Sequence, residues 1–101
     1  MHKSIYTQQY QTLLEILREV RAAVGMTQGD LADRLGMGQS DISKCEMGTR
    51  RLDVVELKLW VEALGSDLPS VVRELEDRGK SSAILSLPHA QEVKSRRNDN
   101  R

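Results

Sequence analysis

The segment between residues 27 and 47 predicts two short helices, over 27–35 and 39–47, that follow one another almost without a break. An apolar residue and a capping position precede each helix, and an aspartate stands in each first turn, where the positive helix end favours a carboxylate. These residues are Met26, Thr27 and Asp30 for the first helix and Met37, Gly38 and Asp41 for the second. Two helices joined by about three residues have to cross at a steep angle, as in a helix-turn-helix.

The residues inside this segment meet the steric demands of such a crossing. Ala32 is small enough to let the helices approach closely, and Gly36 tolerates the left-handed backbone that ends the first helix. On the second helix, Ile42 and Cys45 share an apolar face. We therefore expect Ala32, Gly36, Ile42 and Cys45 to form the scaffold of the crossing, with Cys45 as a core residue.

One helix is expected before this pair and another after it. Between residues 10 and 24, apolar side chains recur at helical spacing, at Tyr10, Leu13, Leu17, Val20 and Val24. Asp53 and Glu56 form a capping box, which begins a helix that ends near residue 64. The core face of that helix is predicted to comprise Val54, Leu57, Val61 and Leu64, with Trp60 packing at its edge.

A last helix is expected after Ser66 and Asp67, ending near Gly79. One face of this helix carries Leu68, Val71, Val72 and Leu75. This face has two interpretations, because it can close the core of its own domain or form the interface of a homodimer. A second apolar face on the 53–64 helix, with Val55 and Leu59, can pack against the last helix or the N-terminal arm, or contribute to a subunit interface.

The composition changes after the last helix. Residues 79–101 are rich in Ser, Lys, Arg and Asn, with a short apolar island over 83–87. We therefore divide the chain into a helical domain, 1–78, and a tail, 79–101, that is disordered or binds a partner.

Within the wider pattern, the 27–48 segment resembles the Xre-like family of regulators, which includes the lambda-type phage repressors and Cro. The resemblance covers about residues 13–64. Its pattern is matched by Gln28, Leu31, Ala32, Leu35, Gly36, Met37, Ile42, Cys45 and Gly48. It implies an all-α, five-helix, lambda-repressor-like DNA-binding domain, in which Arg21 pairs with Glu46 as part of the scaffold.

The resemblance also implies that the exposed face of the 39–47 helix enters the major groove of DNA. The polar residues predicted to read bases there are Gln39, Ser40, Ser43 and Lys44, which share one side of the helix at about 100° per residue. A glutamine amide suits this task, because it donates to and accepts from adenine at once. The candidate phosphate ligands are Thr27, Gln28, Arg50 and Arg51.

The expected function is that of a sequence-specific transcriptional regulator, a repressor, which binds an inverted-repeat operator of double-stranded DNA as a homodimer. The chain contains one cysteine and no apolar run of membrane-spanning length, which favours a cytoplasmic protein without disulfides. No arrangement of residues indicates an enzyme, a metal site or a cofactor.

The charge distribution keeps other functions open. Residues 1–78 contain 10 basic and 13 acidic residues, a net charge of −3, whereas residues 79–101 carry +3. A DNA-binding domain is usually basic. One alternative is the antitoxin of a toxin–antitoxin pair, whose tail wraps its partner, and another is an adaptor that has kept the fold and lost DNA binding.

Overall fold

Five α-helices make up the part of the chain that the computed structural model describes, which is residues 2–86 for the backbone and 7–79 for the side chains. The helices are α1 (His2–Ala23), α2 (Gln28–Leu35), α3 (Gln39–Met47), α4 (Val54–Ala63) and α5 (Leu68–Ser86). Residues 2–86 contain no strand, so the predicted all-α, five-helix architecture is confirmed.

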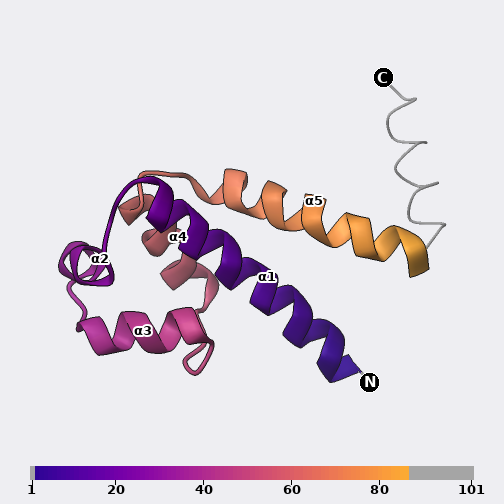
Figure 1. Ribbon diagram of the computed structural model, residues 1–101, viewed down its shortest axis with the longest axis horizontal. Helices are drawn as coiled ribbons and strands as arrows, with labels where there is room; N and C mark the ends of the chain where they lie inside the picture. The colour runs from indigo at the N-terminus through magenta and orange to yellow at the C-terminus, as the bar shows by residue number, and fades with distance from the viewer. Residues whose placement is uncertain (1, 87–101) are drawn as a thin grey trace.

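The two long helices, α1 and α5, pack against each other and run in opposite directions (Figure 1). The short helices α2, α3 and α4 gather around the C-terminal half of α1, with α3 below it and α5 above it in this view. The N-terminal end of α1 and the C-terminal end of α5 extend beyond this cluster. The core therefore lies at one end of the long-helix pair.

Side chains from all five helices build one hydrophobic core. Its most completely buried members are Leu14, Leu17, Leu31, Ile42, Cys45, Trp60, Val61 and Leu64. The predicted core position of Cys45 is confirmed. Val24, which was expected on the same stripe as Leu13 and Leu17, is exposed, because α1 ends at Ala23 and the chain turns away through Gly25.

The two long helices extend further than the sequence predicted. α1 begins at His2 instead of near Tyr10, and α5 ends at Ser86 instead of near Gly79. Gly79 does not adopt the left-handed backbone that would stop the helix. A glycine inside a helix costs about 1 kcal/mol relative to alanine, which neighbouring turns can tolerate. The first residues of the predicted tail, 79–86, thus have a helical backbone that continues α5, and the remainder of the tail lies outside the described residues.

The outward and inward faces of α4 differ from the prediction at one position. Trp60, Val61 and Leu64 are buried and Leu57 is half-buried, as expected. Val54, the first residue of the helix, is exposed. The indole Nε1 of Trp60 is buried without a hydrogen-bond partner among the described residues.

The apolar face of α5 mainly serves the domain's own core. Val71 is buried, and Leu68 and Leu75 are half-buried against the core cluster. Val72 alone of the four candidate interface residues is exposed, at 41%. Val71 therefore has to be withdrawn as an interface residue, because its side chain is enclosed within a single copy of the chain.

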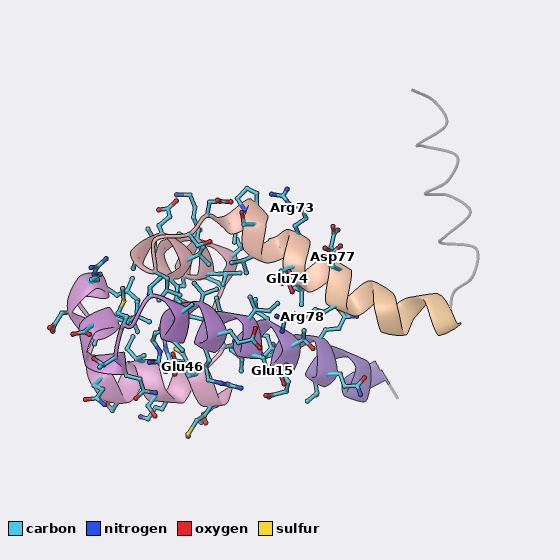
Figure 2. All side chains as sticks on the ribbon, turned by 45° about the horizontal axis from the view of Figure 1, so that its top comes forward. Glu15, Glu46, Arg73, Glu74, Asp77 and Arg78 are labelled. Atoms are coloured by element: carbon cyan, nitrogen blue, oxygen red, sulfur yellow. The ribbon has the colours of Figure 1, made fainter. Side chains whose placement is uncertain are left out.

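An ion-pair bridge also ties α5 to α1. Arg78 donates from Nη2 to Glu19 Oε1 at 2.7 Å and from Nε to Glu74 Oε2 at 2.8 Å. Figure 2 shows Arg78 reaching from α5 toward α1. The hydrogen bond from Arg78 lowers the pKa of the exposed Glu19 carboxyl below its ordinary value. Such solvent-accessible pairs orient helices more than they stabilise them.

Candidate nucleic-acid interface

The start of α2 is a reciprocal capping box. Thr27 Oγ1 accepts the backbone N–H of Asp30 at 3.0 Å, and Asp30 Oδ2 accepts the backbone N–H of Thr27 at 3.0 Å. These hydrogen bonds lower the pKa of the Asp30 carboxyl. Because the Thr27 oxygen acts as the acceptor, its O–H remains able to donate to an anion in front of the helix.

The turn between α2 and α3 has the predicted conformation. Gly36 adopts φ 68° and ψ 34°, in the left-handed region, and the N–H of Met37 donates to the carbonyl of Ala32 at 2.9 Å. Ala32 itself is buried in the crossing. α2 and α3 therefore meet in the arrangement that defines a helix-turn-helix.

Helix α3 has a clear division between a buried and an exposed side. Ile42, Cys45 and Glu46 face the core, and Asp41 is only half-exposed. The opposite side carries Gln39, Ser40 and Lys44, which are exposed, and Ser43, which is half-exposed. The four residues predicted to read bases thus lie together on the exposed side of α3. Helix α3 itself lies at the edge of the molecule (Figure 1).

The end of α3 is fixed by Gly48, which adopts φ 85°. A Cβ atom added there would lie 3.3 Å from Leu14 Cδ1 and 3.3 Å from Gln11 Nε2. Both the backbone conformation and the tight contact with α1 therefore favour glycine at this position.

A two-point ion pair holds α3 against α1. Arg21 donates from Nε to Glu46 Oε2 at 2.6 Å and from Nη2 to Glu46 Oε1 at 2.9 Å, and its Nη1 donates to the carbonyl of Met26 at 2.9 Å. Only 4% of the Glu46 side chain and 18% of the Arg21 side chain are exposed. Figure 2 shows Glu46, a residue of α3, next to the side of α1 that faces α3. The predicted pair is therefore present.

Sequence reasoning missed a second arginine at this junction. Arg18 Nη1 donates to the backbone carbonyl of Glu46 at 2.7 Å, near the end of α3. The only available signal is the spacing of Arg18 and Arg21, which lie about one turn apart on α1. Two cations near the C-terminal end of α3 also complement its negative dipole end.

A chain of polar contacts leads from this ion pair to the outer face of α3. Gln28 Nε2 donates to Glu46 Oε1 at 3.0 Å, and Gln39 Nε2 lies 3.5 Å from Gln28 Oε1. The structure thus brings together the first residues of α2 and α3. Gln28 is half-buried and Gln39 is exposed, so the chain of contacts opens to solvent at Gln39.

The two arginines after α3 point in different directions. Arg50 Nη2 contacts Glu56 Oε2 at 2.9 Å, and Arg50 Nη1 contacts Cys45 Sγ at 3.1 Å. These contacts raise the pKa of Arg50, with the Cys45 hydrogen bond as the largest cause. Arg50 is therefore held against the domain.

Arg51, by contrast, is exposed and rests on an aromatic ring. Its guanidinium carbon lies 4.4 Å from the centroid of the Tyr10 ring, within the range of a cation–π contact. Tyr10 Oη also accepts the backbone N–H of Leu52 at 3.0 Å. Tyr10 thus fixes both the backbone and the arginine of the connection between α3 and α4.

The fold and this exposed polar helix define a DNA-binding helix-turn-helix regulator. Residues 17–71 match a helix-turn-helix family model. A solved structure of an XRE-family like protein from Pseudomonas syringae pv. tomato str. DC3000 is similar, with 43% sequence identity and a TM-score of 0.73 over 76% of this chain and 94% of that chain. The chain belongs to the Xre-like helix-turn-helix family, as the sequence resemblance predicted. The comparison with curated proteins found no match.

No helix within residues 2–86 combines the length and apolar character needed to cross a membrane. In the same described part of the chain, no group of three or more His, Cys, Asp or Glu side chains is placed to hold a metal ion.

Proposed function

We propose that this DNA-binding protein is a sequence-specific repressor that places α3 in the major groove of an inverted-repeat operator. The observation that carries the proposal is the continuous set of contacts from the partly buried Arg21–Glu46 pair through Gln28 to Gln39. A side chain that reads a base has to be held in a defined position, because its hydrogen bonds are directional.

Gln39 is the proposed base reader. It is the first residue of α3, and the beginning of such a helix reaches base edges first. When one Nε2 hydrogen of Gln39 points to Gln28, the second hydrogen and Oε1 remain for the two-point recognition of adenine. Ser40, Ser43 and Lys44 are proposed to make further base or phosphate contacts from the same side of the helix.

The proposed phosphate ligands surround this face. Thr27 and Gln28 stand at the N-terminal end of α2, where the backbone and the helix dipole favour an anion. Arg51, held on Tyr10, adds a positive charge after the other end of α3. Arg50 remains a proposed phosphate ligand, although it would first have to leave Glu56.

The net negative charge of the helical domain is compatible with this docking face. Glu74 and Asp77 belong to α5, which lies on the opposite side of α1 from α3 (Figure 2). Salt screens exposed charges beyond about 10 Å at 0.1 M ionic strength. Repulsion from these residues should therefore weaken DNA binding mainly at low salt.

A homodimer is proposed because a single recognition helix reads too few base pairs for useful specificity. Two domains related by a two-fold axis present their α3 helices to half-sites about one DNA turn, or 34 Å, apart. Occupation of such a site near a promoter would block polymerase, which is the proposed mode of repression.

Footprinting on the DNA around the protein's own gene tests the proposal. The expected result is protection of an inverted repeat. A specific competitor DNA should abolish this protection, whereas a random competitor DNA should not. Equal competition by both DNAs would refute sequence specificity. The absence of any binding, even at low salt, would instead favour the adaptor function.

A further inference from the structure

Helix α4 presents an apolar surface that nothing in the described chain covers. Val54 is 66% exposed, Val55 is 61% exposed and Leu59 is 50% exposed. Val55 and Leu59 lie one turn apart on the side of α4 opposite Val61. Within residues 7–79 no side chain covers Val55 and Leu59, so the subunit contact that the sequence offered for them stays open.

The charges beside this surface have opposite signs. Lys58 and Glu62 lie next to Val55 and Leu59, and Lys58 Nζ is 3.0 Å from Glu62 Oε2. Both side chains are about half exposed, at 54% and 50%. The outward face of α4 therefore combines two large apolar residues with one cation and one anion, spaced by one helical turn.

Such a face is complementary to itself. In a two-fold dimer the same surface meets its copy, so residue i contacts j of the partner while j contacts i. When two α4 helices pack antiparallel with the axis midway between Lys58 and Glu62, the Lys58 of each copy meets the Glu62 of the other copy. A face of one sign would repel its copy, whereas this face attracts it.

We propose that two copies of this chain associate through the α4 face, which we define as Val55, Lys58, Leu59 and Glu62 with Val54 at its edge. This proposal deepens the proposed function, because it names the surface that joins the two DNA-binding domains. It rests on the proposed function in one respect, which is that the two copies are related by a two-fold axis. Within residues 68–79, the competing surface on α5 offers a single large exposed apolar residue, Val72, because Leu68, Val71 and Leu75 pack against the core.

Sedimentation of the full chain without DNA provides the first test. The wild-type protein should dimerise, and Leu59→Asp should raise the dimer dissociation constant by about tenfold or more, because it places a charge at the centre of the contact. Val72→Asp is the matched control, since it introduces the same charge at an exposed apolar residue of α5. A circular dichroism melt of each variant establishes that the fold is retained.

A charge exchange provides the second test and does not depend on apolar residues. Lys58→Glu places two anions on the α4 face, and Glu62→Lys places two cations there. Each variant alone should dimerise weakly, because its face then repels its copy. An equimolar mixture should form a heterodimer at close to wild-type affinity, because every anion again meets a cation. A role confined to the ion pair within one helix predicts no recovery on mixing.

Three results would overturn the inference. These are a wild-type chain that stays monomeric, a dimer that Val72→Asp disrupts while Leu59→Asp does not, and a mixture of the charge variants that stays monomeric. A dimer that binds no operator would instead refute the proposed function and leave the α4 face in place. An operator footprint from a monomeric chain would instead refute the contact through the α4 face and leave sequence-specific DNA binding in place.

Discussion

Glu56 binds Arg50 with one carboxylate oxygen and caps α4 with the other. Oε2 lies 2.9 Å from Arg50 Nη2, while Oε1 accepts the backbone N–H of Asp53 at 3.0 Å. The side chain thus restrains a candidate phosphate ligand and begins a helix at the same time. Replacing it separates these two effects, because glutamine also serves in a capping box.

Glu56→Gln should strengthen binding to random DNA. The variant keeps the capping arrangement but weakens the hold on Arg50, which then becomes available to phosphates. The plot of log affinity against log salt concentration should steepen by up to about one unit. Glu76→Gln, on the exposed side of α5, removes the same charge without touching Arg50. Equal steepening in both variants would show that overall charge, rather than release of Arg50, is responsible.

Glu46→Ala should lower the stability of the domain. It leaves the half-buried Arg21 without its carboxylate and removes the acceptor of Gln28. Loss of one partner from a fully buried pair costs about 3 to 5 kcal/mol, and the partial exposure of Arg21 places the expected loss at or below the lower end of that range. Urea unfolding at neutral pH measures it. An unchanged unfolding midpoint together with lost operator binding would assign Glu46 to DNA contact instead of scaffold.

Gln39→Ala should reduce operator affinity by about 1 to 3 kcal/mol and relax the preference at one base pair, with little effect on random DNA. Arg51→Ala should weaken both DNAs alike and reduce the salt slope by roughly one unit. Titrations of both variants on both DNAs at several salt concentrations distinguish these outcomes. If Gln39→Ala weakens specific and random binding equally while Arg51→Ala changes neither, α3 does not dock as proposed.

Asp67 should contribute a pH-dependent part of the stability. Its Oδ1 accepts the backbone N–H of Ser70 at 2.8 Å, which lowers the pKa of the carboxyl below its ordinary value of 3.8. The folded state then binds a proton less readily than the unfolded state, so the contribution is fully present above the unfolded pKa and disappears as the pH falls through the folded pKa.

Asp67→Asn provides the matched variant, because asparagine also caps a helix but does not titrate there. Unfolding measured from neutral pH downward should show a smaller loss of stability below about pH 4 for the variant than for the wild-type protein. Identical acid profiles would show that the Asp67 charge does not contribute to helix capping.

The boundaries of α2 and α3 were predictable because their signals are local. Thr27 caps α2 through its own neighbours, and Gly36 and Gly48 end the two helices in the left-handed conformation. The Arg21–Glu46 pair was also predicted, from the family pattern. In these cases the relevant interactions depend on the sequence within a few residues or on a pattern shared by the family.

The length of α5 and the exposed face of α4 were not predictable in this way. Gly79 signals a helix end in the sequence, yet its backbone stays helical within α5. Val54 was predicted on the core face of its helix, and it is exposed. Which side of a short helix becomes buried depends on the helices that pack against it.

The amino-acid sequence alone therefore determined the helix-turn-helix, its caps and the polar outer side of α3, because capping and helical periodicity act over a few residues. Packing between distant segments determined the rest. It brought Gln28 to Glu46 and Tyr10 to Arg51, and it paired the partly exposed Arg50 with Glu56. Such contacts join residues whose spacing in the chain carries no signal, so they exist only once the helices have assembled around α1.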